Sequence, residues 1–388
     1  MVSTVLLVLG AALLLLALHP FVTYPLSLLA LARLRPLPLH AGRVPPRGRA
    51  ALCVCAYNEE RVIGDKIANM LALRRAAPDL ELLLYVDAAT DRTAEIARHF
   101  AGEIRLVVSS ARQGKTHGMN TLVAMTDADF LIFTDANVMF DLEAVPALLQ
   151  PFADPAVGCV CGHLLYTSRE GGPTAETGGL YWRLEETIKE LESRTGSAMG
   201  ADGSIFAIRR SQHCPPPPDL CDDMFLSLTV LIRGHRVVRA GDAIAHEEAA
   251  ARPAEEFGRK IRIGCMGFNV HRLLRTELRR LPAIERYKYV SHKLLRWFTA
   301  YLLAGSGAFI LAGLAVAGAW TTFTILVLDA VAIGLLALLL PTGPLARARE
   351  MLSAFIATGI GVWRSLRGER FQTWTPVNSA RGPGSADV

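Results

Sequence analysis

The sequence lacks the cysteine pattern of a disulfide-stabilised or zinc-binding protein. Its seven Cys are an odd number, and no two of them form a C-x-x-C pair. Two "CVC" pairs, Cys53/Cys55 and Cys159/Cys161, have the spacing that places both thiols on one face of a strand. Thiols in such positions act as small buried apolar groups. We therefore expect free cysteines in a reducing compartment, with neither a disulfide framework nor a zinc site.

Two nucleotide-binding motifs are also absent. No G-x-G-x-x-G follows the first predicted strand, and no G-x-x-x-x-G-K-[ST] occurs in the chain. These motifs mark dinucleotide-binding folds and P-loop enzymes, so both classes are disfavoured. The formal net charge is only +5 over 388 residues, and many Arg stand beside apolar segments. That placement favours a membrane protein and argues against a nucleic-acid partner.

Charged residues are scarce at the N-terminal end. Val2 to Ala32 is nearly all apolar, lacks the positive start of a signal peptide and is roughly twice as long as its usual apolar core. We therefore expect an uncleaved transmembrane anchor over residues 1–34. The Arg residues that follow predict that the next domain, residues 45–285, lies in the cytoplasm.

Residues 286–388 form a second membrane region. Trp297 to Leu340 contains a single acid, Asp329, and is long enough for two spans of about 20 residues each. We place these spans at about 297–320 and 321–341. A further apolar segment, about 349–365, is too short to cross and lies between Arg-rich stretches, so we expect it to be interfacial or re-entrant, with a cytoplasmic tail. The chain is thus predicted to be a multi-pass protein of the cell (inner or plasma) membrane.

The central domain has the pattern of an α/β fold. Short apolar runs such as "FLIFTD" are typical of buried parallel strands, and helical patterns separate them about every 25 residues. This alternation predicts a doubly wound, mostly parallel sheet. Downstream, "DDMFLSLTVLIRGHRVV" is expected to be a helix capped by Asp222 and ended by Gly234.

Polar residues stand where the predicted strands end. They are Tyr57 to Glu60, Asp87, Lys115 just after the third strand, and Asp135 to Asn137. The carboxyl ends of parallel strands share one edge of a sheet, where open α/β sheets bind ligands. Asp87 could bond the polar edge of a nucleoside, Lys115 suits a diphosphate, and Asp135 suits a hard divalent cation.

The ordered motifs resemble those of the inverting family 2 glycosyltransferases, within them the membrane-embedded group similar to cellulose and hyaluronan synthases. The resemblance covers roughly residues 51–269. It is carried by these segments of the sequence: "CAYNEE", "YVDAATDRT", "RQGKTHGMN", "FTDANV", "GADGSIFAIRR" and "CDDMFLSLTVLIRGHRV". The later "GERFQTWTP" also looks like the W-x-P tail of such enzymes.

The resemblance implies a GT-A (nucleotide-diphospho-sugar transferase) fold and a hexosyltransferase type of activity. The donor would be a nucleotide-sugar, usually UDP-linked, bound with Mg²⁺ or Mn²⁺, and the acceptor a polysaccharide or other glycan. It implies the following roles: Asp223 as the catalytic base, with Asp222 beside it in the catalytic pair; Tyr57, Glu59, Asp87, Lys115, Asp135, Arg259 and Arg262 for the donor; Asp202 and Gly203 for the acceptor; and Asp135 with Asn137 for the metal.

The sequence departs from the family pattern at four places. Asn137 replaces the second Asp of D-x-D, and an Asp222-Asp223 pair replaces E-D. Ala88 replaces the Gly of D-G-S. The Q-x-x-R-W motif is missing; "RKIRIGCMG" stands in its place, where Arg259 and Arg262 could hold a diphosphate. The loss of that motif puts long-chain synthesis in doubt.

Other interpretations stay open. Asp223 could be a first-turn helix acid, Asp87 a turn carboxylate, and Lys115 a solvated lysine. The two Arg of "RKIR" could face anionic lipid, and His246 could be a metal ligand or a satisfied histidine. For the whole chain, the rivals are transfer to a polyprenyl phosphate or other lipid, and a non-catalytic membrane subunit. A separate secretion or assembly subunit is a possible partner.

Overall fold

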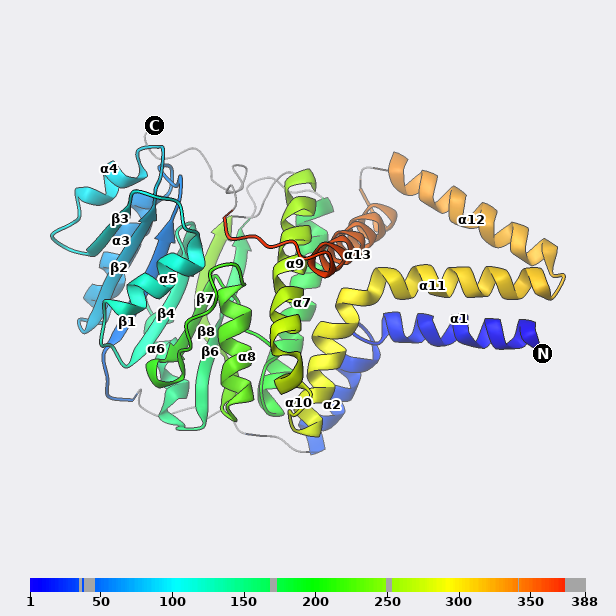
Figure 1. The fold of residues 1–388 in the computed structure, drawn as a ribbon, viewed down its shortest axis with the longest axis horizontal. Coiled ribbons are helices and arrows are strands. Elements are labelled where there is room, and N and C mark those ends of the chain that lie inside the picture. The colour runs from blue at the N-terminus through cyan, green and yellow to red at the C-terminus, as the bar shows by residue number, and fades with distance from the viewer. Residues whose placement is uncertain (35–36, 38–45, 168–172, 249–252, 341, 374–388) are drawn as a thin grey trace.

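The computed structural model describes residues 1–34, 37, 46–167, 173–248, 253–340 and 342–373. A globular part built on one sheet occupies one end of the molecule (Figure 1). Three helices project from the other end: α1 (Val2–Leu18), α11 (Leu295–Val316) and α12 (Trp320–Leu339). The start of the central domain at residue 45 and the W-x-P motif, residues 374–376, lie outside the described residues.

The described strands form one sheet with the order β3-β2-β1-β4-β7-β6-β8-β5. Their bounds are β1 (Ala50–Ala56), β2 (Leu80–Asp87), β3 (Arg105–Ser109), β4 (Phe130–Asp135), β5 (Val138–Phe140), β6 (Val157–Thr167), β7 (Ile205–Arg209) and β8 (Arg236–Glu248). The first four run parallel, as the alternating pattern predicts. The doubly wound expectation is wrong beyond β4, because β7 enters antiparallel between β4 and β6.

Helices cover both faces of this sheet (Figure 1). Leu52 and Val54 of β1 pack with α3 (Ile63–Ala76) on one face, while Ala51 and Cys53 pack with α5 (Lys115–Ala124) and α8 (Asp222–Ile232) on the other. The cysteine pairs therefore lie as predicted, and all seven Cys are free. The shorter helices are α4 (Thr93–Arg98), α6 (Ala144–Leu149), η1 (Gln150–Ala153) and η2 (Arg210–Gln212).

The N-terminal apolar run is a bent pair of helices, where the sequence predicts one anchor over residues 1–34. α1 and α2 (Thr23–Leu34) meet at 58°, which fits a broken span or a re-entrant loop. Pro20 lies in the break, and proline cannot continue a helical hydrogen-bond ladder. α1 packs along α11, where Ser306 Oγ donates to the Gly10 carbonyl at 2.8 Å.

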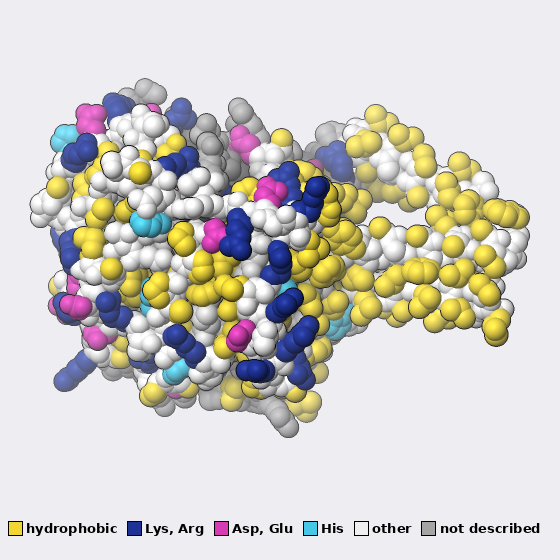
Figure 2. Space-filling view, viewed as in Figure 1, with side chains coloured by type: hydrophobic (Ala, Val, Ile, Leu, Met, Phe, Trp, Pro, Cys, Tyr) yellow, Lys and Arg dark blue, Asp and Glu magenta, His cyan; other side chains and the backbone are white. Residues whose placement is uncertain are grey.

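Two described helical segments are long and apolar enough to cross a membrane: Ala283–Val316 and α12. The first joins α10 (Ala283–Tyr289), a π-helical turn (Val290–Leu294) and α11, so it begins earlier than the predicted 297. Figure 2 shows apolar side chains covering the projecting helices. The predicted segment 349–365 belongs to a longer helix, α13 (Pro344–Leu366), which packs on α9 (Pro253–Leu278).

A buried ionic cluster fixes these helices to the globular part. His292 of the π-helical turn lies 2.7 Å from Glu192 and 2.9 Å from Glu185, both on α7 (Pro173–Arg194). Tyr24 of α2 donates to Glu192 at 2.5 Å, and Arg296 pairs with Glu185. One cluster thus joins α2, α7 and the start of α11, which sets the orientation of the apolar helices relative to the sheet.

Candidate functional site

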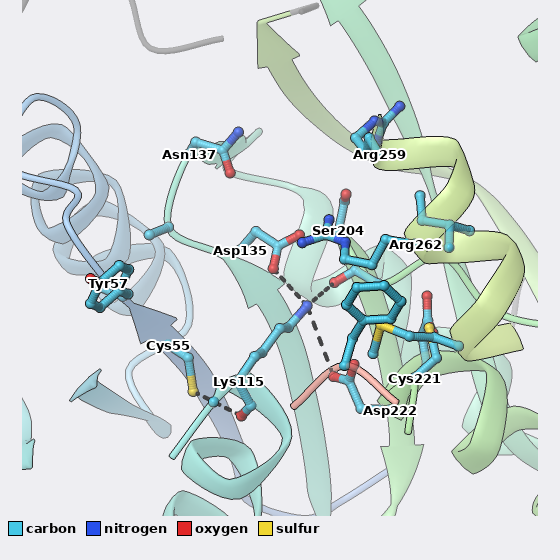
Figure 3. Close-up of a pocket in the computed structure, with 18 of the residues that line it drawn as sticks. Cys55, Tyr57, Lys115, Asp135, Asn137, Ser204, Cys221, Asp222, Arg259 and Arg262 are labelled. Atoms are coloured by element: carbon cyan, nitrogen blue, oxygen red, sulfur yellow. Dashed lines mark hydrogen bonds and ion pairs between the residues drawn. The ribbon is translucent and has the colours of Figure 1, made fainter. Parts of the chain in front are cut away.

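A cavity of about 700 Å³ opens where the parallel strands end. Its lining includes Asp87 after β2, Asp135 after β4 and Asp223 at the start of α8 (Figure 3 shows part of this wall). These acids are far apart in the sequence, and the fold brings them to one pocket. The remaining predicted site residues also line it: Tyr57, Glu59, Lys115, Asn137, Asp202, Gly203, Asp222, Arg259 and Arg262.

Lys115 lies among the carboxylates of this pocket. Its Nζ is 2.6 Å from Asp135 Oδ1, 3.9 Å from Asp222 Oδ2 and 3.5 Å from the Gly203 carbonyl (Figure 3). Burial lowers the pKa of Lys115, but the carboxylates of Asp135 and Asp222 outweigh burial and hold that pKa well above its usual value. The lysine therefore stays charged and offsets part of the negative charge of the two acids. The alternative of a solvated loop lysine is wrong.

Asp87 fixes the loop that leads to this lysine. Its two carboxylate oxygens accept hydrogen bonds from the backbone N–H groups of Gln113 and Gly114, both at 2.8 Å. The side chain is only 3% exposed, so its contact with the cavity is through one edge. Ala88 follows with φ +50°, a left-handed conformation in which glycine is more easily placed. The departure at Ala88 therefore adds backbone strain beside the site.

Tyr57 and Arg112 form another part of the wall. The Arg112 guanidinium carbon lies 3.4 Å from the centre of the Tyr57 ring, a cation–π stack that makes a flat surface in the pocket. Glu59 is buried nearby, in the loop before α3. Arg112 was not predicted from the sequence, although it directly precedes the "QGK" that carries Lys115.

Asp223 has the surroundings of a general base. Its Oδ1 accepts the thiol of Cys221 at 2.8 Å and the backbone N–H of Met224 at 2.6 Å. Burial, and next the charge of Asp222, raises the pKa of Asp223 to about 6. A base with a pKa near the working pH is well suited to accept a proton.

The predicted cap by Asp222 is wrong. Cys221 is the N-cap residue, and Asp222 is the first helical residue of α8, without a side-chain cap. Its Oδ2 is buried and accepts no hydrogen bond within the described part of the chain. The negative charge lies at the positive end of α8, where the helix dipole favours it.

The predicted acceptor residues lie beside the candidate base. A Cβ at Gly203 would come within 2.9 Å of Asp223 Oδ2, so only glycine lets this turn approach the carboxylate so closely. Asp202 Oδ1 accepts from the Ser204 backbone N–H at 3.1 Å, and its Oδ2 is 3.7 Å from Lys189. Gly203 therefore leaves room for Asp223, and Asp202 shapes the turn.

Asp135, Asn137 and Glu247 offer oxygen atoms to a divalent cation. Asn137 Nδ2 donates to Glu247 at 3.1 Å, which leaves the Asn137 amide oxygen available (Figure 3 labels Asn137 and Asp135). Burial raises the pKa of Glu247 to about 7, although Arg259 opposes this. The described residues contain no group of three or more His, Cys, Asp or Glu arranged for a metal. The residues fit Mg²⁺ or Mn²⁺ when donor phosphates supply further ligands.

His246 and Glu247 differ in their position relative to the pocket. His246 Nε2 lies 3.1 Å from Asp141, and His246 is not among the residues that line the pocket. The satisfied-histidine alternative is therefore confirmed. Glu247, its neighbour on β8, does line the cavity. Glu247 was not predicted from the sequence. On an irregular strand, the side of the sheet on which a side chain lies depends on how the strand pairs, and the pairing of β8 has register shifts.

Arg259 and Arg262 of α9 line the pocket, so the interpretation that they face lipid is wrong. Arg259 pairs with Glu256 at 2.8 Å, and this carboxylate holds the pKa of Arg259 above its usual range despite burial. Burial, and next the charge of Arg259, lowers the pKa of Arg262 to about 10. The two guanidinium groups place positive charge opposite Asp135.

A segment after α13 closes one side of the pocket. Phe371 and Thr373 line the cavity, and Gln372 Nε2 donates to the Gln113 carbonyl at 3.0 Å. Asn269 anchors the segment by donating to the Glu369 carbonyl at 3.0 Å. Arg370 forms an ion pair with Asp219. The motif "GERFQT" was recognised in the sequence, but its contact with the donor-side loop was not.

Residues 51–213 match the protein family described as glycosyl transferase family 2. The chain carries a family 2 glycosyltransferase domain. Two relatives are a poly-beta-1,6-N-acetyl-D-glucosamine synthase of Staphylococcus aureus, 28% identical over 49% of this chain, and an O-antigen chain rhamnosyltransferase of Salmonella typhimurium, 28% identical over 36% of it. These alignments cover 47% and 48% of the relatives' own length.

The fold comparison confirms the GT-A expectation. The structure of mannosyltransferase PcManGT from Pyrobaculum calidifontis matches with a TM-score of 0.74 and 20% identity. The match covers 94% of this chain and 99% of that chain, so it includes the helices outside the sheet domain. The chain therefore has the GT-A fold. Its similarity to glycosyltransferases argues against the alternative of a non-catalytic membrane subunit.

Proposed function

We propose that this glycosyltransferase is a membrane-bound inverting enzyme that moves a sugar from a nucleotide-sugar, of the UDP-linked class, to a polysaccharide or other glycan acceptor. One observation carries the proposal: Asp87, Asp135 and Asp223 line a single cavity at the carboxyl edge of the parallel strands. A donor-binding carboxylate, a metal-directed carboxylate and a base are the three groups that the reaction needs in one place.

The donor would occupy the side of the cavity formed by β1, β2 and α5. The flat surface of Tyr57 and Arg112 suits a nucleobase, and Asp87 and Glu59 offer hydrogen-bond acceptors beside it. Lys115, Arg259 and Arg262 supply positive charge for a diphosphate. The similar mannosyltransferase was solved with GDP-Man and Mn²⁺, which supports a nucleotide-sugar at this position.

Asp135 and the Asn137 amide oxygen would hold Mg²⁺ or Mn²⁺ together with the donor phosphates. The cation, when bound, acts as a Lewis acid that stabilises negative charge on the leaving diphosphate. Lys115 contributes to the same stabilisation, because it already lies 2.6 Å from Asp135 and stays protonated. The positive end of α5, which begins at Lys115, adds to this field.

Asp223 would act as the general base. It takes the proton of the acceptor hydroxyl while that oxygen forms a bond to C1 of the sugar, on the face opposite the diphosphate. The bond from C1 to the diphosphate oxygen breaks, and the electron pair leaves with the nucleoside diphosphate. A positioned base contributes about 10²–10⁴-fold to such a rate.

The acceptor would enter beside Asp202 and Gly203. A specific observation also favours a second candidate, a polyprenyl phosphate or other lipid acceptor. The α9 wall of the cavity carries Ile263 and Met266, and α9 packs against α13 next to the apolar helices. An apolar wall beside the membrane region suits a lipid as well as a sugar chain.

The domain would face the cytoplasm at the cell membrane. Figure 2 shows Lys and Arg side chains along the border between the globular part and the apolar helices. α9, which runs along this border, exposes Arg272 and Arg275, and the exposed Arg279 follows directly after it. Basic residues beside spans are typical of the cytoplasmic side. Reporter fusions after α13 that are active only outside the cytoplasm would contradict this orientation.

A donor screen tests the function. Purified protein is incubated with Mn²⁺ and a panel of nucleotide-sugars, and the released nucleoside diphosphate is measured. We expect turnover with one class of donor. The product made from a labelled donor is then partitioned: label in an aqueous glycan supports the first acceptor class, and label in solvent-extractable lipid supports the second. If none of the donors releases nucleoside diphosphate, the proposed function is overturned.

A further inference from the structure

Two polar side chains of α3, Lys66 and Asn69, reach the back of the turn that carries Asp135 and Asn137. Neither side chain lines the cavity. Lys66 contacts the chain on both sides of the turn, at the end of β4 and the start of the short strand β5, and Asn69 contacts the end of β5. Neither residue has a part in the proposed mechanism, so the burial of Lys66 and the pairing of Asn69 need another explanation.

Lys66 is fully buried. Its Nζ donates to the Val138 carbonyl at 2.5 Å and to Thr134 Oγ1 at 3.5 Å, and it lies 5.0 Å from the centre of the Phe140 ring. Burying the polar end of a lysine costs free energy, and an aliphatic side chain of similar length would avoid that cost. One amino group thus bridges the residue before Asp135 and the residue after Asn137.

Asn69 makes a reciprocal pair of hydrogen bonds with Phe140. Its Nδ2 donates to the Phe140 carbonyl at 2.8 Å, and its Oδ1 accepts the Phe140 backbone N–H at 3.0 Å. The side chain therefore pairs with the edge of β5 much as a neighbouring strand would. β5 has only three residues and pairs with β8 on its other side, so this contact holds an otherwise weakly supported strand.

We propose that Lys66 and Asn69 are positioning residues that hold the Asp135–Asn137 turn in the geometry needed to bind the metal–diphosphate part of the donor. This inference rests on the proposed function. Lys66 fixes both ends of the turn, and Asn69 fixes the strand that follows it. A small displacement of a positioned ligand is enough to weaken binding strongly.

The test measures binding without turnover. Calorimetry with Mn²⁺ and either UDP or GDP gives the nucleotide affinity of the wild-type protein and of Lys66→Met. We expect the variant to bind the nucleotide at least about tenfold more weakly, because the turn is no longer held. Donor KM should rise by a similar factor, while kcat at saturating donor changes less.

Lys288 provides a matched control. It is also fully buried, and it donates to the carbonyls of Glu192 at 3.1 Å and Ser197 at 3.4 Å, away from the cavity. Lys288→Met removes a comparable buried amino group and should lower the melting temperature. It should leave nucleotide affinity unchanged, because its contacts do not reach the turn. Equal losses of affinity in the two variants would overturn the inference.

Two further variants keep the test decisive if Lys66→Met folds poorly. Lys66→Arg retains a cation and should recover part of the affinity. Asn69→Leu removes the pairing with Phe140 and should weaken nucleotide binding in the same direction as Lys66→Met. Wild-type protein that binds neither nucleotide would contradict the proposed function itself. Wild-type binding that Lys66→Met and Asn69→Leu leave intact would contradict only the positioning role.

Discussion

Lys115 Nζ lies 2.6 Å from Asp135 Oδ1, so the carboxylate at the end of β4 is neutralised by a lysine from the start of α5. The same ammonium reaches the Gly203 carbonyl at 3.5 Å. One side chain therefore links the donor side of the cavity to the acceptor side. Under the proposed function, a metal-bound diphosphate would meet this ammonium as well as the carboxylate.

Replacing Lys115 with Met should weaken donor binding and slow transfer. We expect kcat/KM to fall by about 10²-fold, because a buried cation beside the leaving group is removed while Asp135 loses its partner. Initial rates over a range of donor concentrations measure the change. Lys260→Met is the control, since Lys260 pairs with Glu256 and does not line the cavity. Similar rates in the two variants would contradict a role for Lys115.

Replacing Asp223 with Asn should abolish most turnover but leave donor binding largely intact. We expect a loss of about 10²–10⁴-fold in kcat, because the amide cannot take the acceptor proton. Rates and calorimetry on the same preparation separate catalysis from binding. Asp141→Asn changes a carboxylate that pairs with His246 and does not line the pocket, so it should leave kcat unchanged. Near-normal activity of Asp223→Asn would show that the base is another residue.

The pH profile should report the ionisation of Asp223. Burial raises its pKa to about 6, and the base works only when deprotonated, so kcat/KM should rise with pH through about 6. The thiol of Cys221 donates to Asp223 at 2.8 Å and lowers that pKa. Cys221→Ala should therefore move the acidic limb to higher pH, and Cys221→Ser, which keeps a donor, should move it less. An acidic limb that is identical in all three proteins would contradict this link.

The segment Glu369–Thr373 should limit the access of water to the donor. Asn269→Ala removes the hydrogen bond to the Glu369 carbonyl, and Arg370→Ala removes the ion pair with Asp219. With both changes the wall formed by Phe371 loses two of the contacts that hold it. We expect a higher rate of donor hydrolysis relative to transfer, because a closed site excludes water. Assays for free sugar in the absence of acceptor measure it; an unchanged ratio would mean that the segment is not a barrier.

The sequence predicts the donor half of the site well, because that half depends on local order. Each of the first four strands is a short apolar run, and the polar residue that ends it must lie at the sheet edge. Asp87 and Asp135 follow from this rule. Asp223 and Gly203 needed the motif resemblance, because α8 and the turn before β7 reach the same edge from later parts of the chain.

Other features depend on packing between distant segments. The antiparallel direction of β7 and the position of Glu247 on the cavity side of β8 depend on strand pairing. The alternation of helices and strands in the sequence does not determine this pairing. Lys66 belongs to a helix that the apolar pattern predicts, but no local pattern shows that a lysine points inward. The bend between α1 and α2 was missed because hydropathy alone treats Pro20 as part of the apolar run.

The segment that holds Phe371 and Thr373 is translated after α13, whereas the acids of the pocket come much earlier. A chain that ends at Leu366 therefore contains every strand-end carboxylate, but it lacks the wall formed by Phe371 and Thr373. Because Glu369 is anchored to α9, and α9 packs on α13, the position of this wall depends on the packing of these two helices. The pocket therefore gains its last wall only from the part of the chain that follows α13.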